Sequence, residues 1–180
     1  ERCIMLNTVY QLKRPRQFEV VFKEMDLDDR HILVRPTHLS ICHADQRYYQ
    51  GTRPDEVLRA KLPMALIHEA IGSVIYDPSG QFQIGDRVVM IPNLPLEEDP
   101  VIAENYLRSS RFRASGMDGF LQEYVQTTAD RMILLSDQVN PMVAAFTELV
   151  SVSYHALQRW LRTAHARRNE TAVWGDGNLG

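Results

Sequence analysis

Short apolar runs, separated by turn residues and with no long helical pattern between them, restrict the fold of the first 139 residues more than any other feature. The runs are rich in β-branched and aromatic residues, which favour strands. They comprise residues 18–22, 32–35, 70–76, 85–92 and 119–126. Pro36 is predicted to end the second strand, because proline cannot donate a hydrogen bond to its neighbour. Strands at this spacing predict a small, mostly antiparallel barrel or sandwich.

The pattern changes at Asn140-Pro141, where Asn can cap a helix and Pro suits its first turn. Apolar residues then recur at helical spacing from Val143 to Trp160. We therefore predict one long helix that ends near Leu161 and buries a broad apolar face.

Residues 171–174 form a short apolar strand candidate, and a glycine-rich segment follows it to residue 180. Its spacing, with Gly175, Gly177 and Gly180, is G-x-G-x-x-G, the entry loop of a dinucleotide-binding βαβ unit. The helix and second strand that complete such a unit do not follow within the 180 residues. The predicted organisation is a β domain at 1–139, a connecting helical region at 140–170 and the start of a nucleotide-binding domain at 171–180.

Charge and composition exclude several classes of function. The chain has 44% hydrophobic residues, and its 20 Lys and Arg against 23 Asp and Glu give a net charge of −3. This balance gives no electrostatic case for binding nucleic acid. No apolar run reaches the roughly 18 residues of a bilayer span, and the first residues lack the apolar core of a secretory signal. Two cysteines, Cys3 and Cys42, cannot build a disulfide framework, so we expect a cytoplasmic globular protein.

Four side chains are candidate metal ligands: Cys42, His68, Glu69 and Glu148. A thiolate and an imidazole are donors that zinc prefers, and a carboxylate can supply a further bond. Glu148 is predicted to lie on or beside the buried face of its helix, where an unpaired carboxylate is costly and calls for a metal, a proton or a cation.

Purely structural roles account for the same residues without a metal. Cys42 could be a small buried apolar side chain, and His68 with Glu69 a hydrogen-bonded core pair. Glu69 could also support the site from behind a ligand rather than bind the metal itself. Residue spacing alone does not choose between these roles.

Several motifs together resemble the zinc-dependent medium-chain dehydrogenase/reductase superfamily, and the resemblance covers nearly the whole chain. They are C-H-A-D-x-R-Y-Y from Cys42, I-H-E at 67–69, G-M-D-G-F at 116–120, T-E-L at 147–149 and the glycine pattern at 175–180. Further phrases, such as 9–12, 15–20 and 102–107, resemble the branch that reduces ribulose 5-phosphate. The resemblance implies a mostly β fold with some α structure: a GroES-like catalytic barrel, then the first strand and glycine loop of a truncated Rossmann domain that binds NADPH.

The same resemblance implies roles for individual residues. A catalytic zinc would be held by Cys42, His68 and a glutamate matching Glu69 or Glu148, and Asp45 would orient the ligand histidine through its second ring nitrogen. Gly175, Gly177 and Gly180 would contact the dinucleotide.

Two departures from the family pattern change the expectations. Ala44 replaces the Ser or Thr that relays the proton in many relatives, so His43, Tyr48 or water would take that role. The segment between Pro92 and Gly119 has no cysteine, whereas relatives with a structural zinc use four there, so we expect one zinc per chain. Candidate phosphate-binding residues, chosen by charge alone, are Arg47, Arg111 and Arg113.

The implied activity is NADPH-dependent reduction of ribulose 5-phosphate to ribitol 5-phosphate, which would supply CDP-ribitol for teichoic acid or capsule synthesis. A cytidylyltransferase would be a pathway partner or a fused domain, and a homodimer is possible by the same resemblance. NADP cannot be told from NAD, because the residue that discriminates them lies beyond residue 180. The alternatives are another zinc polyol or alcohol dehydrogenase, or a zinc-binding module without catalysis. The 180-residue chain alone is expected to be inactive.

Overall fold

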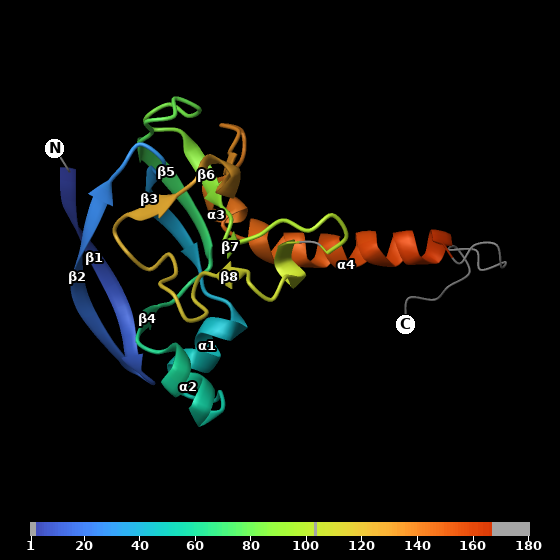
Figure 1. The fold of residues 1–180 in the computed structure, drawn as a ribbon, viewed down its shortest axis with the longest axis horizontal. Coiled ribbons are helices and arrows are strands. Elements are labelled where there is room, and N and C mark those ends of the chain that lie inside the picture. The colour runs from blue at the N-terminus through green and yellow to red at the C-terminus, as the bar shows by residue number, and fades with distance from the viewer. Residues whose placement is uncertain (1–2, 103, 167–180) are drawn as a thin grey trace. The chain divides into compact units, whose positions relative to one another are not determined.

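The structure, a computed structural model, describes residues 3–102 and 104–166 (Figure 1). The chain divides into two compact units, Glu1–Thr147 and Glu148–Gly180. Each unit is described by itself, because their relative placement is not determined. The predicted strand at 171–174 and the glycine residues Gly175, Gly177 and Gly180 lie outside the described residues.

Three antiparallel sheets build the first unit, which confirms the prediction of a mostly β, antiparallel fold. The largest has the order β10-β6-β5-β3-β9, the second has the order β2-β1-β4, and the third is the pair β7-β8. The strands are β1 (Cys3–Arg14), β2 (Gln17–Leu27), β3 (Ile32–Ser40), β4 (Met64–Ala65), β5 (Glu69–Tyr76), β6 (Arg87–Met90), β7 (Asn93–Leu94), β8 (Arg111–Phe112), β9 (Val125–Thr127) and β10 (Met132–Leu134).

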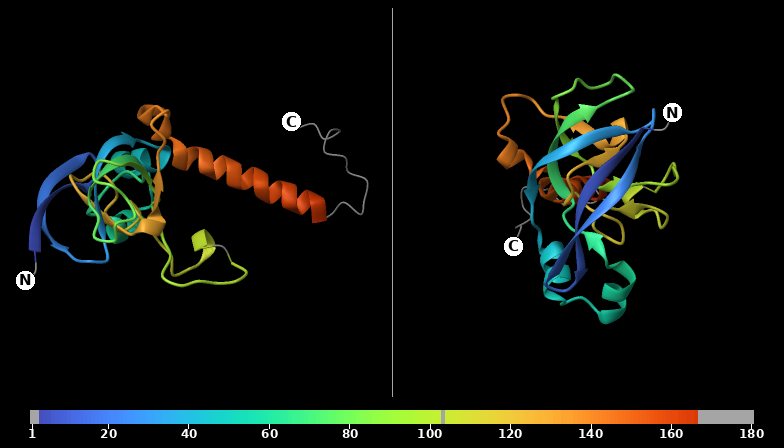
Figure 2. Two further views of the ribbon diagram at one scale, coloured as in Figure 1. Left: turned by 90° about the horizontal axis from the view of Figure 1, so that it is seen from above. Right: turned by 90° about the vertical axis from the view of Figure 1, so that its left-hand side faces the viewer.

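The long hairpin of β1 and β2 lies alongside the five-stranded sheet in each of the three views (Figures 1 and 2). Between them the two sheets enclose a core that includes Leu12, Val34, Met64 and Phe120. Apolar side chains from both sheets therefore meet in one interior, as in a half-closed barrel.

β1 and β3 differ from the sequence prediction, and the short strands β4, β7, β8 and β10 were not predicted. The segment of β1 was not predicted as a strand, although its register with β2 is nearly continuous. β3 does not end at Pro36 but continues to Ser40, with a register shift against β5 between Pro36 and His38. The irregular pairing at that point accommodates a residue that has no N–H to donate.

The predicted strand at 119–126 forms only partly, because β9 begins at Val125. Residues 119–121 instead form a loop that packs on the chain just before β5. The N–H groups of Gly119, Phe120 and Leu121 donate to the carbonyl oxygens of Ala65, Ile67 and Leu66, at 2.8, 2.7 and 3.1 Å. This loop holds the entry to β5 in place.

Helices are few. Two short ones, α1 (His43–Gln50) and α2 (Asp55–Lys61), follow β3, and 3-10 turns lie at η1 (Glu104–Tyr106) and η2 (Ala129–Arg131). Two more, α3 (Pro141–Ala144) and α4 (Thr147–Ala166), occupy the predicted helical region. None of the described helices combines the length and the apolar character that a membrane span requires.

The predicted helix start is confirmed, because Asn140 accepts a hydrogen bond from the Met142 N–H at 2.9 Å and Pro141 is the first helical residue. The prediction of a single helix is wrong, because the helix is interrupted after Ala144, whose carbonyl accepts the Thr147 hydroxyl at 2.6 Å. Ala144 and Ala145 pack on the sheet, whereas Phe146 is about half exposed, at 49%. The buried face from residue 148 onward stays a prediction, because that stretch belongs to the second unit.

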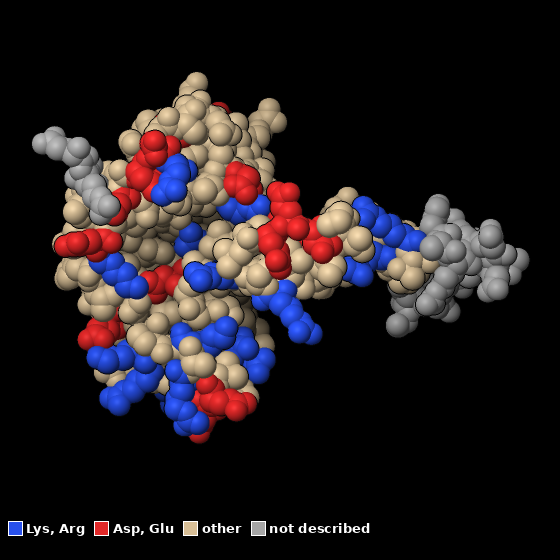
Figure 3. Space-filling view, viewed as in Figure 1, with Lys and Arg blue, Asp and Glu red and all other residues tan. Residues whose placement is uncertain are grey.

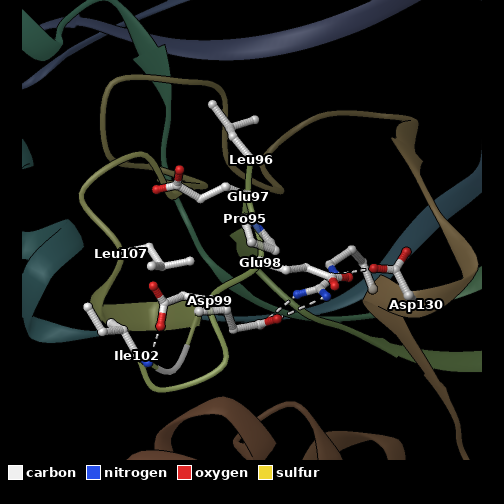
Figure 4. A pocket seen from close by; sticks show the side chains of 10 residues that line it. Pro95, Leu96, Glu97, Glu98, Asp99, Ile102, Leu107 and Asp130 are labelled. Carbon is white, nitrogen blue, oxygen red and sulfur yellow. Dashed lines mark hydrogen bonds and ion pairs between the residues drawn. The ribbon is translucent and has the colours of Figure 1, made fainter.

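A lobe of residues 92–118 is fastened by polar contacts around Glu104. Its carboxylate receives two bonds from Arg131, at 2.7 and 3.1 Å, and one from Asn93 at 3.1 Å. The Arg131 hydrogen bond is the main reason that the pKa of Glu104 lies below its usual value. A cavity of about 590 Å³ opens beside this ion pair, lined mainly by residues 95–99 (Figure 4).

Replacing Glu104 by Gln is expected to destabilise the fold at neutral pH and to have little effect in acid. The folded-state pKa is depressed, so the stabilisation is present above the unfolded-state pKa and is lost as the pH falls below about 4. With Glu104 half exposed, we expect about 0.5–1 kcal/mol at pH 7 after solvent screening. Urea unfolding at pH 7 and at a pH below about 4 measures the difference in unfolding free energy between the variant and the wild type. Glu98→Gln, which lines the same cavity, is the control. A pH-independent difference would contradict the ion-pair interpretation.

Gly119→Ala is expected to destabilise the fold by at least about 2 kcal/mol. A Cβ at this position would lie 2.3 Å from the Ile67 carbonyl oxygen and 2.4 Å from that of Leu66, so backbone would have to move. The control is Gly80→Ala, where no atom lies within 4 Å and only the positive φ of 70° is unfavourable, at about 1–2 kcal/mol. Thermal unfolding of both variants compares them, and an equal loss would show that residues 65–67 can shift.

Candidate metal centre

Cys42 lies at the junction of β3 and α1, where it is the N-cap residue of the helix. Asp45, three residues on, returns its carboxylate to this residue. Its Oδ2 accepts the Cys42 N–H at 3.1 Å and the thiol at 3.3 Å. This is the reciprocal capping geometry of a helix start, and it fixes the position of the sulfur.

Ile67, the residue before His68, is held in a conformation that is rare for its type. Its φ is 72°, in the left-handed region that a β-branched side chain seldom enters. Its N–H donates to Asp45 Oδ1 at 2.8 Å, and its carbonyl accepts the Phe120 N–H at 2.7 Å. Strain of this kind persists only where neighbours hold it, and here it sets the direction in which His68 and Glu69 leave the turn.

The side chains of Cys42, His68 and Glu69 converge. One ligand atom from each lies within 4.8 Å of the others, and the Cys42 Sγ to His68 Nε2 distance is 3.5 Å. The edge of the Phe112 ring borders the imidazole, with 5.2 Å between the ring centroids. They are three of the four candidate ligands that the sequence offered, the fourth being Glu148.

Glu69 supplies the observation that tests whether a metal fits. Its side chain is 1% exposed, and its Oε2 is buried with no hydrogen-bond partner in the described structure. An unsatisfied buried carboxylate oxygen is costly, and a cation beside it would remove that cost. Sulfur, nitrogen and oxygen donors together suit zinc, and three protein ligands leave a fourth position open.

Burial raises the pKa of the Cys42 thiol to about 11, and the neighbouring Asp45 carboxylate contributes in the same direction. Without a metal the group is therefore a thiol at neutral pH. A zinc ion binds cysteine as the thiolate, so its positive charge must replace the proton.

Asp45 supports the site through Cys42 and through the turn before His68. Its hydrogen bonds go to Cys42 and to the Ile67 N–H, so it positions His68 through the backbone of the residue before it. A contact with the imidazole itself, as the resemblance implies, stays a prediction.

Other predicted residues are not among the three converging donors. Glu148 begins the second compact unit, so its candidacy as a ligand stays a prediction. Tyr48, on α1, is 3% exposed and belongs to the main apolar core, and its catalytic role stays a prediction. Arg113 is buried, and its guanidinium donates to the Gln126 carbonyl at 2.6 Å and lies over the Phe120 ring. These contacts occupy Arg113 in holding the 118–126 loop.

Sequence reasoning missed three contributors to this region. Ile67 was visible only as part of I-H-E, and nothing in its residue type indicates a positive φ. Phe112 lies far from His68 in sequence. Asp118 belonged to a quoted motif without a role, yet it accepts hydrogen bonds from Gln11 and from the Ala65 N–H, each at 2.8 Å, and pairs with Lys23. The sequence did offer one signal: Asp118 comes directly before Gly119, and a glycine can mark a place where two backbone segments lie close together.

Removing one donor is expected to remove the metal. We expect the wild type to retain about one zinc per chain after dialysis, and Cys42→Ser and Glu69→Gln to bind it at least about 100-fold more weakly. His38→Gln, outside the cluster, is the control and should keep its zinc. Elemental analysis and native mass spectrometry measure the zinc content.

Glu148→Gln in the same series distinguishes between the two candidate glutamates. If Glu148→Gln loses zinc and Glu69→Gln keeps it, Glu148 is the third ligand in place of Glu69.

Comparison with known proteins agrees with this geometry. Residues 28–137 match the alcohol dehydrogenase GroES-like domain family. The chain is 58% identical over 176 residues to a ribulose-5-phosphate reductase of Bacillus spizizenii and 53% identical to ribulose-5-phosphate reductase 2 of Staphylococcus aureus. Each alignment covers 98% of this chain but 52% of the relative, so the chain spans about half the length of these enzymes.

Solved structures show the same fold. The crystal structure of S. aureus TarJ in complex with NADPH is 40% identical, with a TM-score of 0.69 over 89% of this chain and 43% of the other. L-Idonate 5-dehydrogenase from Escherichia coli is 26% identical, with a TM-score of 0.77 over 87% of this chain and 47% of the other. Together with the antiparallel half-barrel and the Cys-His-Glu cluster, these similarities show that the chain belongs to the medium-chain alcohol dehydrogenase family through a GroES-like domain.

Proposed function

We propose that this chain is the metal-binding catalytic part of a reductase that converts ribulose 5-phosphate to ribitol 5-phosphate with NADPH. The observation that carries the proposal is the convergence of Cys42, His68 and the unsatisfied Glu69 carboxylate. The identity of 58% to a ribulose-5-phosphate reductase supports the choice of substrate.

Zinc, when bound, supplies a Lewis acid that polarises the substrate carbonyl and stabilises the negative charge that develops on its oxygen. Cys42, His68 and Glu69 would hold the ion, and three protein ligands are the number that catalytic zinc sites use. The Asp45 carboxylate and the strained Ile67 keep the donors at their positions before substrate arrives, so little reorganisation is needed during the reaction.

The proton for the product alcohol must come from a group other than residue 44, because alanine has no hydroxyl. We assign it to Tyr48, with His43 and water as the alternatives. Tyr48 lies one helical turn after Asp45, and both are the buried residues of α1. Tyr48 therefore lies on the same face of α1 as Asp45, the residue that is hydrogen-bonded to Cys42.

The remaining parts of the proposal concern the whole protein. The TarJ structure with NADPH supports NADP(H) as the cofactor, held by Gly175, Gly177 and Gly180 in a Rossmann domain that continues past this chain. The product would serve CDP-ribitol formation by a cytidylyltransferase, in the cytoplasm, for a cell-surface polymer. A homodimer of the complete enzyme belongs to the same proposal.

A second candidate is the oxidation of an unphosphorylated polyol. The TM-score of 0.77 to L-idonate 5-dehydrogenase favours it, as the half-barrel fits that enzyme well. The two candidates differ in whether the substrate carries a phosphate.

Steady-state assays of the full-length protein distinguish them. We expect NADPH oxidation with ribulose 5-phosphate, a much weaker reaction with L-idonate and sorbitol, and at least about a 100-fold lower kcat/KM in Cys42→Ser. The 180-residue chain alone should show no turnover. Retained reduction by a Cys42→Ser protein without zinc would contradict the catalytic role of the cluster, and preference for an unphosphorylated polyol would select the second candidate.

A further inference from the structure

Arg53 is a cation whose surroundings the fold does not explain. α1 ends at Gly51, whose φ of 75° reverses the chain, and the Thr52 N–H returns to the Arg47 carbonyl at 3.0 Å. This turn brings the Arg53 guanidinium back over Tyr48, with its central carbon 4.3 Å from the ring centroid. Stacking on an aromatic face fixes a side chain that would otherwise be flexible.

No acid neutralises this guanidinium within residues 3–102 and 104–166. Its Nε is buried without a hydrogen-bond partner, and none of the ion pairs of that region involves it. Asp55 and Glu56 follow it in the first turn of α2 but do not pair with it. Arg131, by contrast, is bonded to both Glu104 and Asp130. A partly desolvated cation without a counter-charge favours an anion from outside the chain.

The position of Arg53 relates it to the donor cluster through α1. Tyr48 follows Cys42 by six residues, a rise of about 9 Å along the helix, and long helical side chains lean back toward the N-terminus. Asp45, on the same buried face, contacts the Cys42 sulfur. Arg53 is therefore held at the far end of the helical face that begins at the metal ligand.

We propose that Arg53 binds the phosphate of the substrate and makes the site selective for a phosphorylated ketose. The inference rests on the proposed function, in which the carbonyl at C2 meets the metal and the phosphate at C5 lies three carbons away. The planar guanidinium offers paired donors that match phosphate oxygens, and the Tyr48 ring holds them in a fixed direction.

The surrounding charge agrees with this role. Figure 3 shows Lys and Arg side chains gathered over the region where Figure 1 draws α1 and α2. Cations in this region would raise the local concentration of a phosphorylated substrate.

The cations suggested by charge alone fit less well. Arg113 is buried and donates to backbone carbonyls. Arg47 lies two residues after Asp45 on α1, and residues at that spacing do not share a helical face. Arg111 is exposed, and it precedes Phe112 in β8, so its side chain points away from the face on which Phe112 meets His68.

The test uses the full-length enzyme and removes the charge while keeping the stem that covers Tyr48. Arg53→Met should raise KM for ribulose 5-phosphate about 10- to 100-fold and leave kcat/KM for unphosphorylated D-ribulose within about two-fold. Arg53→Lys keeps the positive charge but loses the paired donors of the guanidinium, so its KM should lie between those of the wild type and Arg53→Met. Arg59→Gln, an exposed cation on α2, is the matched control and should retain the wild-type KM.

Inorganic phosphate provides a second readout that does not depend on turnover of ribulose. It should compete with ribulose 5-phosphate in the wild type and in Arg59→Gln, and at least about ten-fold more weakly in Arg53→Met. Zinc content reports whether each variant is folded at the metal centre.

The outcomes separate this inference from the proposed function. An unchanged KM in Arg53→Met, or an equal loss with both substrates, would overturn the role of Arg53 while reduction of ribulose 5-phosphate by the wild type still upheld the function. A wild type that does not prefer the phosphorylated ketose would overturn both.

Discussion

The Asp45 carboxylate is the contact on which the site depends, because it joins two segments that are 22 residues apart in sequence. One oxygen holds the backbone and thiol of Cys42, and the other holds the N–H of Ile67. Both oxygens are used and the residue is 3% exposed, so little else could take its place without leaving a buried donor unsatisfied. The helix cap and the metal centre are thus one structure: the bond that starts α1 also sets the sulfur beside the imidazole.

The loop at 116–120 also holds residues 65–67, the segment that leads to His68 and Glu69. Asp118 ties the G-M-D-G-F loop to β1 and to Ala65, and Gly119 lets that loop approach the carbonyl oxygens of residues 66 and 67. The Phe120 N–H then closes on Ile67. The left-handed conformation of Ile67 persists because bonds on both sides of it are satisfied only in that geometry. Strain at one residue is offset by hydrogen bonds from α1 and from the loop at Phe120, which would leave the donors preorganised for a metal.

Several features were accessible from sequence because they are local. Strand-forming composition located β3, β5 and β6 of the main sheet, and Asn140-Pro141 marked a helix start. The donor types of Cys42, His68, Glu69 and Glu148 made zinc a candidate before any convergence was known, since thiolate, imidazole and carboxylate are donors that it accepts. The strand predicted at 119–126 forms only partly, because the N–H groups of its first residues donate to the carbonyl oxygens of residues 65–67. Strand propensity describes single residues and does not predict such bonds to a distant segment. The apolar spacing of 143–160 predicted helix, which α3 and α4 provide, but it did not predict the interruption after Ala144.

The sequence by itself indicated a mostly β fold and donor types that suit zinc, because strand-forming runs, turn residues and donor types act over a few neighbouring residues, and its motifs carried the resemblance to the family. Tertiary structure decided which donors meet: it brought Glu69 to Cys42 and His68, bonded Asp45 to the Ile67 N–H, and placed Arg53 on Tyr48 without a counter-charge among the described residues. The physical reason is that hydrogen bonds and ion contacts at a site join segments whose separation along the chain carries no signal in composition or periodicity. The packed antiparallel sheets, the positive φ at Ile67 and the turn after α1 bring those groups close together.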